Sequence, residues 1–324
     1  MERILLCKPR MCGREIDFIK AALAEDWAVP LGPDCDAFEQ ELEKFVNTKA
    51  QDGTSVSTVP LSGNIAALVS GTAALHLALI ACGVKPGDEV LVQSFTFCAS
   101  TNPIAYLGAT PVFVDSEEET WNIDPDLLEE AIQDRIAKTG RKPKAIIPVA
   151  LYGMPYKIDD ILNVAEKFGI PVIEDAAEGL GSRYKGQVLG TFGRFGALSF
   201  NGNKMITTSG GGALICTDAA TRKTIMWYAT QARESYPYYQ HEVVGYNYRL
   251  SNISACIGRA QMTVLDEHIA HHRHVQALYE ELLADVKGVT MHCNPSPEYD
   301  SNYWLCTATL DPDLRIKGQQ NAYR

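Results

Sequence analysis

Ala145-Ile-Ile-Pro-Val-Ala-Leu151 is an apolar run of strand length, and residues 158–168 follow it with apolar side chains at helical spacing. We expect this helix to end at Gly169, because glycine commonly follows the last turn of a helix. The next run, Ile170-Pro-Val-Ile-Glu-Asp175, is apolar again. A strand, a helix and a second strand in this order are typical of a parallel sheet covered by helices. The stretch therefore predicts an α/β fold.

The same alternation extends in both directions, from about residue 72 to residue 218. Further strands are expected over residues 89–93, 110–115, 197–200 and 212–216. Helices are expected over residues 72–81, 99–107 and 125–138, the last with Asp124 as its N-cap. Ligand sites of such sheets lie beyond the carboxyl ends of the strands, so the chemistry is expected there.

The outer segments complete the predicted organisation. Helices are expected over residues 15–24 and 35–46, separated by a loop at 26–33, and the polar residues 47–64 are interpreted as a surface excursion. A helical pattern covers residues 251–286, and residues 303–310 have the pattern of a strand. We expect a large domain over residues 1–250. Residues 251–324 are expected to form a long helix and the start of a smaller C-terminal domain, incomplete because it stops after one strand.

Composition excludes several classes of partner. The net charge is −11 over 324 residues, and clustered Lys and Arg are lacking, so no nucleic-acid partner is expected. The nine cysteines form no CxxC pair, which favours a reduced, cytoplasmic protein. The first residues lack the pattern of a signal peptide, and no apolar run approaches the ~18 residues of a membrane span. We therefore expect no membrane partner.

Lys204 is the most conspicuous candidate for chemistry, because it is the only cation between Arg194 and Arg222. Apolar residues, hydroxyls and glycines surround it, so no neighbour in the sequence pairs with its ammonium. Burial without a partner would favour the neutral amine, which is a nucleophile. A strand-end lysine that reaches out to solvent is the alternative, and the residue taken alone favours it.

Asp175 closes an apolar strand, where its carboxylate would face the ligand crevice. A lysine and a carboxylate at two strand ends of one sheet suit a pyridoxal phosphate site. The lysine forms the imine, and the acid keeps the pyridine nitrogen protonated. The alternative for Asp175 is an N-cap of a following helix.

Ser70-Gly-Thr-Ala-Ala74 opens a predicted helix, whose free N–H groups and hydroxyls can hold a phosphate. Plain helix capping explains the same residues. Phe95 and Phe97 lie just past a strand, where one ring could stack on a planar cofactor, although core packing suits either ring alone.

His268 and His272 have the i, i+4 spacing of a metal pair. The charged neighbours Glu267 and Arg273 favour a solvated helix face instead, so no metal site is expected. The glycines at 210–212 fit neither the Walker phosphate loop nor a Gly-x-Gly-x-x-Gly motif, which argues against the corresponding nucleotide folds.

Taken together, several motifs resemble the sugar aminotransferases of the DegT/DnrJ/StrS family, in order and spacing, from about residue 8 to residue 310. The matching motifs are Ser70-Gly-Thr-Ala-Ala74, Gln93-Ser-Phe-Thr-Phe-Cys-Ala-Ser100, Gly108-Ala-Thr-Pro-Val-Phe-Val-Asp115, Glu174-Asp-Ala-Ala-Glu178, Ser199-Phe-Asn-Gly-Asn-Lys204 and Gly245-Tyr-Asn-Tyr-Arg-Leu-Ser251. The resemblance implies the aspartate-aminotransferase fold, pyridoxal phosphate fold type I. That fold has a large domain with a mixed, mainly parallel sheet and a smaller C-terminal domain, and it forms a homodimer with shared active sites.

The resemblance also assigns roles to residues. Lys204 would hold pyridoxal 5'-phosphate and later move the proton, with pyridoxamine phosphate as intermediate, and Asp175 would pair with the pyridinium. The remaining cofactor contacts implied are Glu178 and Phe97 at the ring, Thr72, Ala73 and Ser199 at the phosphate, and Asn247 at the phosphate of the other subunit's cofactor. The substrate contacts implied are Trp27, Pro30, Leu31, Tyr248 and Arg249.

The implied reaction transfers an amino group from glutamate to C4 of a nucleotide-linked 4-keto-6-deoxy sugar, for surface polysaccharide or glycan biosynthesis. A UDP-linked N-acetylated sugar is slightly favoured. One alternative is a sugar dehydratase of the same fold, but those family members carry histidine where this chain has Lys204. Another is a non-catalytic protein that binds the cofactor or a sugar nucleotide. Residues 47–64 are longer than the family's usual link before Ser-Gly-Thr.

Overall fold

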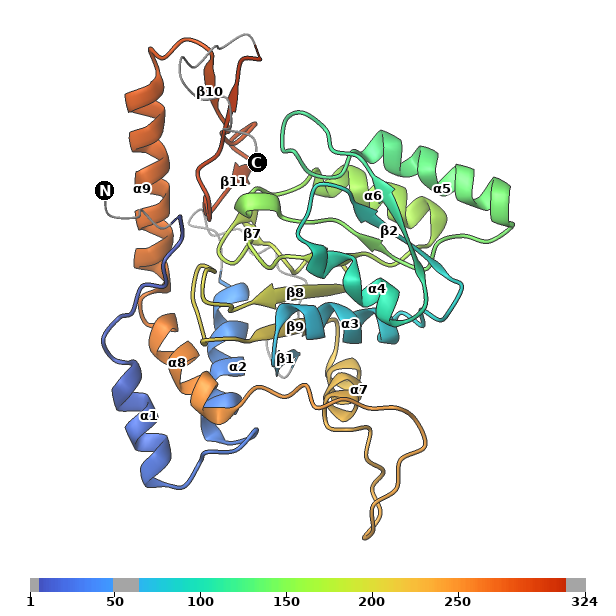
Figure 1. The fold of residues 1–324 in the computed structure, drawn as a ribbon, viewed down its shortest axis with the longest axis vertical. Helices are drawn as coiled ribbons and strands as arrows, with labels where there is room; N and C mark the ends of the chain where they lie inside the picture. Colours follow the sequence, from blue (N-terminus) through green and yellow to red (C-terminus); the bar gives the residue numbers. More distant parts are fainter. Residues whose placement is uncertain (1–5, 49–63, 313–324) are drawn as a thin grey trace.

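A mixed, mainly parallel sheet lies at the centre of the computed structural model, which describes residues 6–48 and 64–312 (Figure 1). Parallel bridges from Ile146 to Val172 and from Val149 to Asp175 join its two halves. The spatial order of the strands is β3 (Thr110–Val114), β2 (Glu89–Gln93), β4 (Ile146–Ile147), β5 (Ile173–Asp175), β8 (Phe195–Ser199), β9 (Gly212–Cys216) and β1 (Ile65–Leu68). Within this sheet β9 runs antiparallel to both of its neighbours. The predicted α/β fold class is confirmed.

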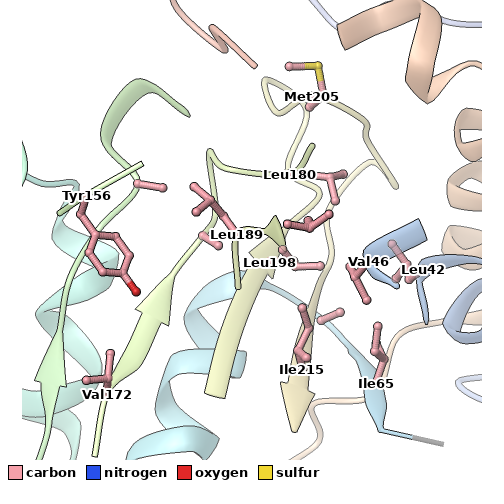
Figure 2. Close-up of a cluster of buried hydrophobic side chains, with 14 of the residues drawn as sticks. Leu42, Val46, Ile65, Tyr156, Val172, Leu180, Leu189, Leu198, Met205 and Ile215 are labelled. Atoms are coloured by element: carbon pink, nitrogen blue, oxygen red, sulfur yellow. The ribbon is translucent and has the colours of Figure 1, made fainter. Parts of the chain in front are cut away.

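Helices cover both faces of this sheet, because its strands are apolar on both sides. Along β9, Ala213 and Ile215 point to one buried cluster, and Leu214 and Cys216 point to the other. The first cluster receives α2 (Pro33–Val46), α5 (Pro125–Thr139) and α6 (Ile158–Phe168), and the second receives α3 (Gly71–Ala81), α4 (Asn102–Tyr106) and α7 (Ala219–Ala229). Figure 2 shows part of the first cluster, where Leu42 and Val46 of α2 approach Ile65 and Ile215 of the sheet.

The C-terminal part begins with α8 (Asn252–Met262), which packs against α2 and α1 (Glu15–Ala24). The longer α9 (Leu265–Leu283) then runs along one side of the molecule, and β10 (Val289–Met291) pairs with β12 (Ala308–Leu310) near its far end (Figure 1). Between these two strands the chain returns to the sheet domain, where β11 (Tyr299–Asp300) pairs with β6 (Arg183–Tyr184) of a hairpin completed by β7 (Gln187–Val188). The division at residue 250 stays a prediction.

Several predicted elements differ from the structure. The single helix expected over residues 251–286 is two helices, because the backbone at Val264 (φ −126°, ψ 11°) is not helical. The strand expected over 303–310 is only β12. The strands expected over 145–151 and 170–175 are short, since Pro148 and Pro171 have no N–H for a strand ladder. The helix expected over 99–107 is divided between a turn, η1 (Cys98–Ser100), and α4.

Other predictions hold closely. Helix α1 has the expected bounds, α6 ends at Gly169 in the left-handed conformation, and the Asp124 side chain accepts N–H bonds at the start of α5. Strand β1 and helix α7 were not predicted. Most of the excursion expected over residues 47–64 lies outside the described residues. Among the residues that are described, none of the helices is both long and apolar enough to cross a membrane.

Candidate active site

A cavity of about 360 Å³ opens where β5 and β8 end and α3 begins. This is the carboxyl end of the parallel strands, where the sequence places the chemistry. The structure brings six of the predicted site residues to the cavity wall: Thr72, Phe97, Asp175, Glu178, Ser199 and Lys204.

Lys204 lies in a turn just after β8 and has a carboxylate partner. Its Nζ is 3.1 Å from Oε1 of Glu178, and both side chains are nearly buried, at 12% and 11% exposure. The expectation of an ammonium without a partner is therefore wrong, because a residue 26 positions away in the sequence supplies the charge. Nζ also lies 4.2 Å from the centre of the Trp304 ring, a cation–π distance. The solvent-reaching alternative for this lysine is excluded as well.

Glu178 is held from both sides. Its Oε2 accepts a hydrogen bond from the backbone N–H of Tyr152 at 2.7 Å, while Oε1 faces the lysine. Burial raises the pKa of Glu178, and the charge of Lys204 opposes that rise. The pair therefore places one positive and one negative group at the wall of a largely apolar cavity.

Asp175 is buried at the end of β5 and is also hydrogen-bonded. Its Oδ2 accepts from the Ser100 hydroxyl at 2.6 Å, and Oδ1 accepts from the backbone N–H of Ala177 at 3.2 Å. Burial raises the pKa of Asp175, and these hydrogen bonds hold it down. No helix follows in the described chain directly after Asp175, so the alternative of a helix N-cap is wrong.

The start of α3 lies against the ends of β8 and β9. Ser70 is the N-cap, and its Oγ accepts from the N–H of Ala73 at 3.0 Å. A Cβ added to Gly71 would lie 3.0 Å from Cβ of Ser199, a tight contact, so this close approach favours glycine. The hydroxyls of Thr72 and Ser199 thus lie beside a helix N-terminus, where a phosphate would bind. Ala73 itself is buried and does not line the cavity.

Phe97 lies at the cavity with its side chain 70% exposed, and Phe95 is 46% exposed. Core packing, the alternative weighed for these rings, is therefore wrong for both. Because the ring of Phe97 is not part of the core, it can stack on a planar ligand in the cavity without disturbing core packing.

The other predicted contacts lie away from this cavity. Trp27, Pro30 and Leu31 form the loop between α1 and α2, and Asn247 is exposed on a segment that bridges to Thr230. On the same segment, Tyr248 stacks on Tyr246, and Arg249 lines a different cavity beside Glu39 and Arg222. None of these six residues lines the cavity that contains Lys204.

Sequence reasoning missed three residues at the site. Ser100 lies within the quoted motif Gln93 to Ser100, so its position was available although its bond to Asp175 was not. Trp304 and Asn302 carry no signal in the sequence, because the chain returns to the site only through β11. The amide of Asn302 donates to the backbone oxygens of Glu178 and Leu180, at 2.8 and 2.9 Å, and so fixes this returning segment.

Each histidine of the pair on α9 contacts a backbone carbonyl through Nδ1. Nδ1 of His268 is 3.3 Å from the carbonyl of Met205, and Nδ1 of His272 is 3.1 Å from that of Tyr303. The predicted solvated face is not correct for His268, which is buried. Within residues 6–48 and 64–312, no three or more His, Cys, Asp or Glu side chains lie together so that they could hold a metal ion.

The residues at the cavity fit pyridoxal phosphate. Lys204 offers an amine, Asp175 a buried carboxylate for a pyridine nitrogen, and the start of α3 a set of phosphate donors. On this fold, that combination defines a pyridoxal phosphate-dependent enzyme. The chain belongs to the DegT/DnrJ/EryC1/StrS aminotransferase family, whose profile matches residues 9–320.

Similar proteins agree with this assignment. The chain is 48% identical to EpsN of Bacillus subtilis, which carries the name of a pyridoxal phosphate-dependent aminotransferase, over 97% of this chain and 76% of EpsN. It is 38% identical to the GDP-perosamine synthase of Caulobacter vibrioides, over 99% of this chain and 81% of that protein.

A solved structure of a DegT DnrJ EryC1 StrS aminotransferase from Brucella abortus aligns with a TM-score of 0.81 and 30% identity, over 91% of this chain and 74% of that chain. The chain is thus a pyridoxal phosphate-dependent sugar aminotransferase. The dehydratase and non-catalytic alternatives find no support in these relatives.

Proposed function

We propose that this enzyme transfers an amino group from glutamate to C4 of a nucleotide-linked 4-keto-6-deoxy sugar. The observation that carries the proposal is the cavity in which Lys204, Glu178 and Asp175 lie together. The relative from Caulobacter vibrioides supports the substrate class, because its name is that of an enzyme that makes a nucleotide-linked amino sugar. Among nucleotides, the resemblance in sequence slightly favours UDP and an N-acetylated sugar.

When bound, pyridoxal phosphate supplies an electron sink that lets a proton leave the carbon next to the amine. Asp175 would hold the proton on the pyridine nitrogen, since a buried anion strongly favours a cation beside it. Lys204 would bind the cofactor through its Nζ and then, as a free amine, carry the proton between donor and acceptor carbons. Glu178 and Trp304 keep this amine at the cavity wall while it is not bound.

The remaining contacts are proposed by position. Thr72 and Ser199 would hold the phosphate at the start of α3, and Phe97 would stack on the cofactor ring. Asn247 lies away from the cavity of its own chain, which suits a residue that reaches the cofactor of a second copy. We therefore propose a homodimer with shared active sites, in which Tyr248 and the loop of Trp27 also meet the substrate.

Spectroscopy of the purified enzyme tests the cofactor assignment. The protein with added pyridoxal phosphate is expected to absorb in the visible range of a lysine-bound cofactor, and borohydride followed by mass mapping should mark Lys204. Lys204→Arg is the matched control and should neither absorb nor be labelled. A colourless wild-type protein that takes up no pyridoxal phosphate would refute the assignment.

An assay panel tests the substrate. UDP-, GDP- and dTDP-linked 4-keto-6-deoxy sugars are each offered with glutamate, and 2-oxoglutarate and the amino sugar are measured. Amination of at least one member is expected, because the relative from Caulobacter vibrioides is named for the synthesis of a nucleotide-linked sugar. If the coloured enzyme aminates none of them but accepts a sugar with its ketone at another carbon, the assignment to C4 is wrong.

A further inference from the structure

A second cavity, of about 330 Å³, adjoins the active site on the other side of Lys204. Lys204 and Trp304 line both cavities, so these two side chains form the wall between them. The second cavity is built from segments far apart in the sequence: residues 6–10, the turn after Lys204, the inner side of α9, and residues 304–306.

The lining of this second cavity is cationic. Lys8 and Arg10 contribute positive charge, and none of the described residues that line the cavity has a carboxylate. This is unexpected in a chain with a net charge of −11. A concave site lined by one sign of charge raises the local concentration of ions of the opposite sign. The cavity therefore favours an anionic ligand.

These two cations have no carboxylate partner in the described part of the chain. The salt bridges there include neither Lys8 nor Arg10, and both residues are exposed. They stand two positions apart on a segment without regular secondary structure, and both line the cavity. Their charges are therefore available together to a ligand in the cavity.

Histidines of α9 form the opposite wall of the cavity. Each of His268 and His272 is fixed by a bond between Nδ1 and a backbone carbonyl. Because a carbonyl only accepts, Nδ1 carries the proton in the neutral ring. Burial lowers the pKa of both residues, which disfavours their charged form, so the positive charge that we assign to the cavity is that of Lys8 and Arg10.

We propose that this cavity binds the diphosphate group of the nucleotide-linked sugar, with Lys8 and Arg10 as its charged contacts. The inference rests on the proposed function, because it takes the substrate class from there. In such a substrate the keto carbon at C4 and the diphosphate at C1 lie at opposite ends of the sugar ring. One molecule then needs two adjoining sites, one at the cofactor and one of positive charge, and the two cavities on either side of Lys204 provide them.

Arg249, one of the substrate contacts that the resemblance implies, is the other cationic candidate for the diphosphate. Arg249 lines a separate cavity that also holds the carboxylates of Asp36 and Glu39. A diphosphate there would meet negative charge as well as positive, whereas the cavity beside Lys204 presents only positive charge.

Calorimetry with inorganic pyrophosphate tests the proposal on the pyridoxal phosphate-loaded protein at low salt. The double variant Lys8→Gln/Arg10→Gln is expected to weaken pyrophosphate binding at least about tenfold, since each charged hydrogen bond lost is worth about that factor. The matched control, Lys20→Gln/Lys223→Gln, removes two exposed lysines away from the cavity and should bind pyrophosphate as the wild type does. Unchanged cofactor absorbance and circular dichroism show that the double variant is folded.

Three results would overturn the proposal. In the first, the double variant binds pyrophosphate as tightly as the wild type does. In the second, Arg249→Gln weakens pyrophosphate binding tenfold and the double variant does not. In the third, the double variant still binds pyrophosphate but no longer binds glutarate, a dicarboxylate that stands in for the amino donor. The binding readout does not depend on turnover. A sugar panel without any amination refutes the proposed function, whereas an unchanged pyrophosphate affinity refutes the diphosphate site.

Discussion

Replacing Ser100 by alanine tests the support of Asp175 directly. The Ser100 hydroxyl is fully buried and donates to Oδ2 of Asp175 at 2.6 Å, and the Thr96 hydroxyl lies 2.7 Å from it on the other side. A hydrogen bond to a charged group contributes about 1.5–3 kcal/mol. Ser100→Ala removes this bond and leaves a carboxylate oxygen in a site that water does not easily enter. For a chain of this size the loss lowers Tm by roughly 2–4 °C at neutral pH.

The loss should depend on pH with a definite sign. Burial raises the pKa of Asp175 above its value in the unfolded chain, and the Ser100 hydroxyl opposes the rise. The folded protein therefore keeps the Asp175 proton to higher pH than the unfolded chain, and ionising the group costs stability as pH rises. Without Ser100 that cost is greater. The destabilisation by Ser100→Ala is thus largest above the folded pKa of Asp175 and smallest in acid, where the carboxyl is protonated in both states.

Thermal unfolding of the cofactor-free protein across a pH series measures this effect. Ser94→Ala is the matched control, because the Ser94 hydroxyl also donates to a carboxylate, Oδ1 of Asp115 at 3.2 Å, but at an exposed position. It should change the free energy of unfolding by less than about 0.5 kcal/mol at every pH. Equal Tm losses for Ser100→Ala in acid and at neutral pH would refute the reasoning, since they would show that the serine contributes packing alone.

Three further predictions follow from the site and its surroundings. Asp175→Asn should keep the fold by circular dichroism yet lose transamination by orders of magnitude, and near-normal turnover in the keto-sugar assay would contradict the proposed role. Gly153→Ala should destabilise the protein by at least about 2 kcal/mol more than Gly13→Ala in urea unfolding. Both glycines have positive φ, at 92° and 86°, but only the first would press a Cβ into a buried side chain. Glu178→Gln breaks the nearly buried pair with the lysine and should cost about 3–5 kcal/mol in the cofactor-free protein, whereas Asp134→Asn in an exposed pair should cost less than about 1 kcal/mol.

The sequence predicts the parts of the fold that depend on local pattern. The strand, helix and strand from residue 145 to Asp175 are visible because apolar spacing and Gly169 specify them within a short window. The spatial order of the strands in the sheet cannot be predicted from such local patterns. Strand β1 lies next to β9, and nothing near residues 65–68 indicates that partner.

The same distinction applies to the site. Asp175 and the start of α3 are recognisable because one closes and the other opens a regular element, and Lys204 is recognisable because it is the only cation between Arg194 and Arg222. The partner of Lys204 is not, since Glu178 approaches it through the parallel arrangement of two strands rather than through sequence spacing. Trp304 was interpreted as part of a strand, because an aromatic residue in an apolar run has that pattern. Its place beside the lysine depends on the pairing of β11 with β6, on the hydrogen bonds of Asn302, and on the bond from Nε1 of Trp304 to the carbonyl of Asn203.

The place of β1 in the sheet also has a consequence for how the protein is made. β1 spans Ile65–Leu68 at one edge of the sheet, and its partner β9 begins at Gly212. A ribosome that adds about 5–20 residues per second needs roughly 7–30 s to make the chain between them. Over that interval the four apolar residues of β1 lack their partner strand β9, so the nascent chain exposes an unpaired apolar segment for seconds. Chaperone binding to the growing chain should therefore be strongest before residue 216 leaves the ribosome.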